Sequence, residues 1–138
     1  MFKKLMMIAV VAAVPVAHAC TYEYSAGPAL TNVIKQRSGF EIPDTSCKLL
    51  EAAGMGLKLE ANATVLSGVS IAWVSASVID RNRVVSSTYF SNTSVNAKDQ
   101  GSMDRAEQLM YEALVAAVRG LDVPKAIDEV RGFRRKAK

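Results

Sequence analysis

The sequence contains a single histidine, His18, which lies in an apolar N-terminal segment that we expect to be removed from the mature protein. A mature chain without histidine has no Ser-His-Asp or Cys-His catalytic arrangement and no histidine ligand for zinc. It also lacks the side chain that most often acts as a general acid or base near neutral pH. We therefore expect a protein that is not an enzyme.

Cysteine is almost as scarce, because Cys20 and Cys47 are the only two in the chain. Such a pair in an exported protein tends to form a disulfide, which leaves no thiolate for catalysis or metal binding. We predict this disulfide and no metal site. The alternative is a lipid anchor on Cys20, although Ala17-His18-Ala19 lacks the leucine that is typical of lipoprotein signals.

Cofactor-binding motifs are missing as well. Gly54-Met55-Gly56 lacks the third glycine of a dinucleotide-binding loop, and the sequence has neither a P-loop nor an EF-hand pattern. Glu60 and Asp80 come nearest to a glycosidase pair, but the strand register expected below separates them along neighbouring strands. We predict no cofactor and no catalytic residues.

No apolar run reaches the roughly 20 residues that a membrane-spanning helix needs. The longest, residues 5–16, follows two lysines and precedes Ala17-His18-Ala19. This order is typical of a secretory signal peptide. We predict that residues 1–19 are cleaved and that the protein is periplasmic, without stable insertion in the membrane.

Basic residues exceed acidic residues by 17 to 13, which gives a formal net charge of +4. Five of the basic residues lie in 131–138, where there is no acid. Without these five and the two lysines of the signal, the charge is 4 − 7 = −3, which does not indicate nucleic-acid binding. We expect one domain over residues 20–130 and a disordered basic tail over 131–138, whose alternative role is attraction to anionic envelope polymers or lipids.

Apolar residues at helical spacing predict four helices. The first runs from Gly27-Pro28 to Gly39, and a short one covers residues 47–53. The longest follows Ser102 and ends near Arg119. A final short helix runs from Asp122 to Gly132.

Between the second and third helices we predict an antiparallel meander of three strands. Residues 56–66 alternate between apolar and polar side chains, and Ser67-Gly68 is a turn signal that sets Ala61 opposite Val74. A second turn, centred on Arg81-Asn82, sets Val74 opposite Tyr89 on the same apolar side. Residues 91–101 are a loop or a short edge strand. The fold class is α+β, with the long helix packed on the apolar face and short helices flanking it.

The other face of this sheet carries Trp73, the only tryptophan in the chain, and Phe90 among hydroxyl side chains. The expected register places both Asn62 and Phe90 opposite Trp73. Either residues 20–46 cover this face, or a protein partner or second copy binds it, or the tryptophan stacks on a sugar. The turn Asp80-Arg81-Asn82-Arg83 is expected to protrude, and with Trp73 and Phe90 it is our candidate partner-binding site.

The signal, the size, the cysteine pair and the sheet give this chain a layout that resembles the small periplasmic immunity proteins and lysozyme inhibitors, which block cell-wall-degrading enzymes. The resemblance implies an inhibitor whose loop or sheet face closes the cleft of a secreted hydrolase. The competing expectation is an accessory or structural lipoprotein of an envelope assembly or secretion machine.

Overall fold

The computed structural model describes residues 20–99 and 101–137, so the predicted signal peptide lies outside the described residues. The described residues form the strands β1 (Tyr24–Ala26), β2 (Met55–Leu66), β3 (Val69–Asp80) and β4 (Ser86–Ala97), and the helices α1 (Pro28–Gln36), α2 (Asp44–Ala53), α3 (Met103–Gly120) and α4 (Val123–Lys136). In this part of the chain the strands make one sheet in the order β1-β2-β3-β4. The α+β class is confirmed.

The sheet is mixed and not purely antiparallel as predicted. Strands β2, β3 and β4 form the expected meander, but β1 pairs with β2 in parallel, with Tyr24 opposite Leu57. Gly56 permits this pairing, because a Cβ atom there would lie 2.6 Å from the carbonyl oxygen of Glu23. The Leu57 N–H donates to the same oxygen at 2.9 Å. A strand of three residues is too short to produce an alternating pattern in the sequence.

The register between β2 and β3 is the predicted one, with Ala61 opposite Val74 and Leu57 opposite Val78. Its cause is the tight turn, in which Ser67 and Gly68 both have positive φ, 51° and 75°. Two-residue turns of this kind match the twist of the flanking strands and fix the register of the hairpin.

The register predicted between β3 and β4 is wrong by four residues over most of its length. Phe90 lies opposite Ser77 and not opposite Trp73, and Ile79 lies opposite Ser86. Between these two pairs β3 has one residue, Val78, whereas β4 has three, residues 87–89, so β4 bulges. Because the displacement is even, the predicted apolar side of β4 still faces α3.

Ser87 holds the bulge together. Its hydroxyl group is buried, accepts the Val78 N–H at 3.0 Å and donates to the Tyr89 carbonyl oxygen at 2.7 Å. A side-chain oxygen therefore replaces a backbone acceptor in the ladder.

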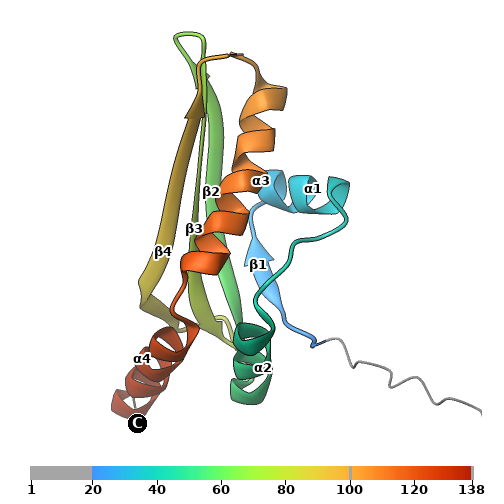
Figure 1. The fold of residues 1–138 in the computed structure, drawn as a ribbon. Helices are drawn as coiled ribbons and strands as arrows, with labels where there is room; N and C mark the ends of the chain where they lie inside the picture. Colours follow the sequence, from blue (N-terminus) through green and yellow to red (C-terminus); the bar gives the residue numbers. More distant parts are fainter. Residues whose placement is uncertain (1–19, 100, 138) are drawn as a thin grey trace, which may run out of the picture.

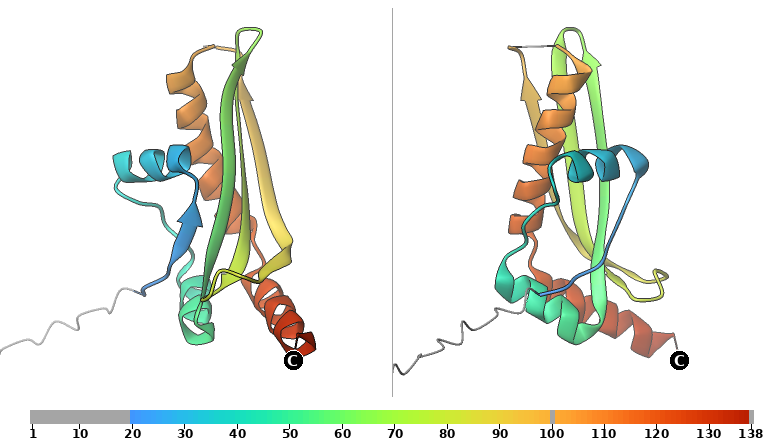
Figure 2. Two further views of the ribbon diagram at one scale, coloured as in Figure 1. Left: turned by 180° about the vertical axis from the view of Figure 1, so that it is seen from behind. Right: turned by 90° about the vertical axis from the view of Figure 1, so that its right-hand side faces the viewer.

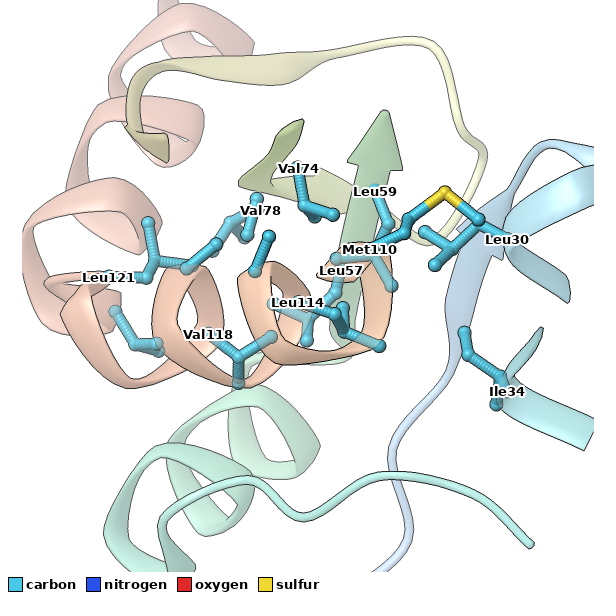
Figure 3. Packing of buried hydrophobic residues seen from close by; sticks show 14 of the residues in the cluster. Leu30, Ile34, Leu57, Leu59, Val74, Val78, Met110, Leu114, Val118 and Leu121 are labelled. Atoms are coloured by element: carbon cyan, nitrogen blue, oxygen red, sulfur yellow. The ribbon is translucent and has the colours of Figure 1, made fainter. Parts of the chain in front are cut away.

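Helix α3 lies along one face of the sheet, and α2 and α4 lie at the end of the sheet where β3 meets β4 (Figure 1). Small residues of α3, such as Ala113 and Ala117, are fully buried and let the helix lie close to the strands. Figure 3 shows the large apolar side chains of this core: Leu57, Leu59, Val74, Val78, Met110, Leu114, Val118 and Leu121.

Helix α1 packs on the same side of the sheet as α3, as the two views of Figure 2 show. Its buried residues, Leu30, Val33 and Ile34, belong to the core beneath α3. The loop after α1 is tied to α3, because the Tyr111 hydroxyl donates to the Gly39 carbonyl oxygen at 3.0 Å. The idea that residues 20–46 cover Trp73 is therefore wrong, because α1 lies on the side of α3 and β1 extends the sheet beside β2.

Cys20 and Cys47 form the predicted disulfide, with their Cα atoms 6.1 Å apart. The bond ties the segment before β1 to α2. Next to it, Tyr22 packs edge-on against Phe40 at 5.7 Å, and its hydroxyl donates to the Phe40 carbonyl oxygen at 2.9 Å. A lipid on Cys20 would need the sulfur atom that this disulfide occupies.

Helix α4 continues through Gly132 to Lys136, so most of the segment predicted as a disordered tail is helical. The final helix expected after α3 is therefore present, and it extends four residues beyond the predicted end at Gly132. Within the described residues, no helix combines the length and the apolar character needed to cross a bilayer.

Candidate interaction surfaces

The side of β2, β3 and β4 that faces away from α3, called the open face below, is not overlaid by any of the described helices (Figures 1 and 2). Its composition is mainly polar, but it also carries large apolar residues on all three strands. Its side chains are Lys58, Glu60, Asn62, Thr64 and Leu66 of β2, Ile71, Trp73, Ser75, Ser77 and Ile79 of β3, and Phe90, Asn92, Ser94 and Asn96 of β4. Lys58 and Glu60 pair at 3.0 Å.

Trp73 lies in the middle of the open face, with Asn62 on one side and Ser94 on the other. Trp73 is 37% exposed. The prediction that Asn62 is a neighbour is confirmed. The prediction that Phe90 is the other neighbour is wrong, because the longer turn and the bulge displace β4.

Phe90 instead lies nearer the turn that joins β3 to β4. It is opposite Ser77, four residues from Trp73 along β3, and this spacing corresponds to about 13 Å. Phe90 is 55% exposed. The two aromatic residues therefore belong to different parts of the open face.

The turn between β3 and β4 projects from the end of the sheet (Figure 2). We call residues 81–84 the arginine turn. Arg81, Asn82, Arg83 and Val84 are all exposed, as the prediction of a protruding tip requires, and Val84 is 80% exposed. Arg83 takes a left-handed conformation, with φ 56°. Among the described residues neither arginine has an acidic side chain in ion-pair contact.

Asp80 differs from its three neighbours, because it is only 3% exposed and does not belong to the tip. Its Oδ1 atom accepts the N–H groups of Val84 and Val85 at 2.8 and 3.0 Å. Its Oδ2 atom lies 3.8 Å from Nε of Arg134. The expectation that Asp80 protrudes is wrong, because its carboxylate closes the turn from inside.

These contacts shift the pKa of Asp80. Burial alone would raise it, but the N–H groups of Val85 and Val84 and the guanidinium of Arg134 stabilise the carboxylate more strongly. The net effect holds the pKa of Asp80 below its usual value of 3.8. The negative charge is thus part of the folded turn at neutral pH.

A cavity of about 230 Å³ lies beside the arginine turn, between the start of β2 and the end of α2. Arg81, Arg83, Glu23 and Glu51 supply charges of both signs to its walls. Ligand sites for drug-sized molecules occupy about 300–1,000 Å³, so this cavity is smaller than a usual site of that kind. The cavity could not be predicted from the sequence, because its walls come from separate segments of the chain.

On the other side of the same end, α4 is fastened to β4. Glu129 accepts the Tyr89 N–H at 2.8 Å through Oε2 and the Thr88 hydroxyl through Oε1. The Thr88 hydroxyl and the Tyr89 N–H lower the pKa of Glu129. Lys125 adds a cation–π contact, with Nζ 4.2 Å from the centre of the Tyr89 ring.

Within the described residues, no three or more acidic, cysteine or histidine side chains gather in a way that could hold a metal ion. Comparisons with protein-family models, with curated proteins and with solved structures find no match to this chain.

Proposed function

We propose that the protein is an exported inhibitor of a cell-wall-degrading enzyme and that the arginine turn enters the enzyme's cleft. The observation that carries this proposal is the exposed pair of arginines, Arg81 and Arg83, neither of which is in ion-pair contact with an acid within the described residues. Enzymes that cut glycan chains hold two carboxyl groups about 5–10 Å apart in one cleft. Guanidinium groups bind carboxylates through paired, charge-assisted hydrogen bonds.

The turn suits this role because it is held in one conformation before a partner binds. The Asp80 carboxylate accepts two N–H groups of the turn region, from Val84 and Val85. The Arg83 N–H donates to the Asp80 carbonyl oxygen at 2.9 Å. A loop that is already ordered loses less conformational entropy on binding, which favours tight inhibition.

Apolar side chains near the turn supply the rest of the contact. Val84 is in the turn itself, and Phe90 lies opposite Ser77, three residues or about 10 Å from Asp80 at the end of β3. Interfaces commonly combine arginine and aromatic anchors with a polar rim. Trp73 is seven residues from Asp80, about 23 Å. A round interface of standard size, about 800 Å² per partner, has a radius of about 16 Å, so Trp73 lies outside one that is centred on the turn.

The proposal is tested by adding the mature protein to a panel of peptidoglycan-cleaving enzymes acting on purified peptidoglycan. We expect stoichiometric inhibition of at least one glycan-cleaving enzyme. Arg81→Glu should weaken binding at least tenfold, corresponding to about 1.4 kcal/mol. Lys35→Glu is the matched control, because it makes the same charge change at an exposed position on α1.

Calorimetric titration of the inhibited enzyme with both variants separates loss of binding from loss of folding, which circular dichroism monitors. If folded Arg81→Glu and folded Lys35→Glu bind the enzyme with equal affinity, the turn is not part of the interface. Absence of inhibition across the panel would refute the proposed class of partner.

A further inference from the structure

Strand β4 is an edge strand, and within the described residues it pairs only with β3. Its twelve residues, Ser86–Ala97, include no charged residue and no proline. Natural sheets usually protect long edges with lysine, proline or a covering segment, because an unprotected edge pairs with another strand. Glu129 binds β4 only near the turn, at Thr88 and Tyr89. Within the described residues, the remainder of the β4 edge lacks these protections and is therefore suited to pairing with another strand.

The register shows which backbone groups of β4 face outward. The Asp80 N–H donates to the Val85 carbonyl oxygen, and the Val78 N–H donates to Ser87, so the even-numbered residues of β3 direct their backbone groups toward β4. Each lies opposite an odd-numbered residue of β4, as Val74 lies opposite Thr93. Because backbone groups alternate along a strand, the even-numbered residues of β4 point theirs away from the sheet.

The outward-facing residues are Asn92, Ser94 and Asn96, together with Phe90. In the described part of the chain, the backbone groups of Asn92, Ser94 and Asn96 are not engaged by any turn, loop or side-chain hydrogen bond. Figures 1 and 2 show no segment beside this part of the edge. Each of these residues therefore offers an N–H and a carbonyl group to a further strand.

We propose that this edge binds a second copy of the same chain, antiparallel, with the two-fold axis at Ser94. Ser94 then lies opposite Ser94 of the second copy, and Asn92 lies opposite Asn96 of the second copy on both sides of the axis. This register forms about six backbone hydrogen bonds. Side-chain amides are both donors and acceptors, so the two Asn92–Asn96 pairs are complementary to each other.

Charge supports a second copy as the occupant. Reversing an uncharged strand onto itself brings no like charges together, which favours the self-complementary surface that a two-fold interface needs. The charged residues that follow the strand, Lys98 and Asp99 of the second copy, come opposite Phe90 and Tyr89 at the ends of the pairing, and Asp99 is paired with Arg105. The two open faces would join into one sheet of twice the width, and this inference does not depend on the proposed inhibitor function.

Cysteine cross-linking tests the register. Residues directly opposite each other in a hydrogen-bonded antiparallel pair have Cα atoms about 5.5 Å apart, which suits a disulfide. We expect Ser94→Cys to form a covalent dimer under mild oxidation, in the protein that retains its Cys20–Cys47 disulfide. Asn62→Cys is the control, because it is exposed on the same open face but lies on β2, away from the β4 edge.

Sedimentation equilibrium of the unmodified mature protein should show a dimer that Ser94→Pro dissociates, since proline removes an outward N–H but leaves the ladder with β3 intact. A protein that stays monomeric up to about 1 mM overturns the proposal. The proposal is also overturned if Ser94→Cys cross-links no faster than Asn62→Cys. This second test does not depend on whether Ser94→Pro folds.

Discussion

Oδ2 of Asp80 lies 3.8 Å from Nε of Arg134, which links the end of β3 to the last part of α4. The other carboxylate oxygen of Asp80 accepts two N–H groups at the base of the arginine turn. A single buried carboxylate thus shapes the exposed turn and holds the C-terminal helix beside it. Its removal should affect both.

Replacing Asp80 by alanine should lower the free energy of unfolding by about 1–3 kcal/mol, because the N–H groups of Val84 and Val85 lose their acceptor. Arg134→Ala should cost less than about 1 kcal/mol, since the Arg134 side chain is 46% exposed. Asp128→Ala is the control, because the Asp128 side chain is 79% exposed. Urea unfolding measures all three, and an Asp80→Ala effect no larger than that of Asp128→Ala would contradict this role.

The contribution of Asp80 should depend on pH in one direction. Its pKa in the folded protein is below 3.8, the value expected for an unperturbed aspartate, so the ionised form stabilises the fold. The stabilisation by the Asp80 carboxylate is complete above the unfolded-state pKa of about 3.8 and is lost as the pH falls through the lower pKa of the folded state. The difference in unfolding free energy between the unmodified protein and Asp80→Asn should therefore be constant from about pH 7 to pH 5 and shrink below about pH 4. A difference that grows on acidification would reverse the assigned sign.

Removing the disulfide should destabilise the protein by about 3–4 kcal/mol on the chain-entropy model, because Cys20 and Cys47 are separated by 27 residues in the sequence. Urea unfolding of the Cys20→Ser/Cys47→Ser double variant measures the cost. Mass spectrometry of the mature protein provides the complementary observation. A mass two hydrogens below the reduced chain indicates the disulfide, whereas a diacylglyceryl adduct on Cys20 would contradict it.

Side chains on the two faces of the sheet should differ strongly in their effect on stability. Leu57→Ala should cost about 2–5 kcal/mol, because Leu57 is fully buried. Phe90→Ala should cost less than about 1 kcal/mol, since Phe90 is 55% exposed on the open face. Thermal and urea unfolding distinguish the two, and similar losses would mean that the open face is covered in solution.

Trp73 is the only tryptophan, so its fluorescence reports on the open face directly. At 37% exposure the indole should be quenched readily by acrylamide. Formation of the β4-edge dimer should leave the emission maximum almost unchanged, because Trp73 lies on the neighbouring strand, opposite Ser94. A Trp73 that acrylamide cannot quench would show that another segment or molecule covers it.

The hairpin of β2 and β3 could be predicted from the sequence because local information fixes it. A two-residue turn at Ser67-Gly68 leaves one register that turns the alternate apolar residues of both strands toward the same face. The turn after β3 is different, since its length depends on the hydrogen bonds of the Asp80 side chain to Val84 and Val85. The sequence around Asp80 does not indicate that its side chain accepts these hydrogen bonds, so the length of the turn could not be predicted.

The candidate interaction surfaces, like the fold, could be predicted only where local sequence determines them. The exposure of Arg81, Asn82 and Arg83 followed from their position in a turn. The separation of Trp73 from Phe90 did not, because it depends on the bulge at residues 87–89. The edge of β4 was predictable only in part, because a short edge strand was one of two expectations for residues 91–101, whose many serines and asparagines also resemble a loop in composition.

The bulge held by Ser87 has a consequence for how this protein can change in length. Because β4 already accommodates two more residues than β3 between the pairs Ile79–Ser86 and Ser77–Phe90, this position can absorb insertions and deletions. A change of two residues here would keep every side chain of β4 on its present side, whereas a change of one would turn the strand inside out. In related sequences the number of residues in the bulge should therefore differ by two and not by one, because only such changes keep the same side chains of β4 facing α3.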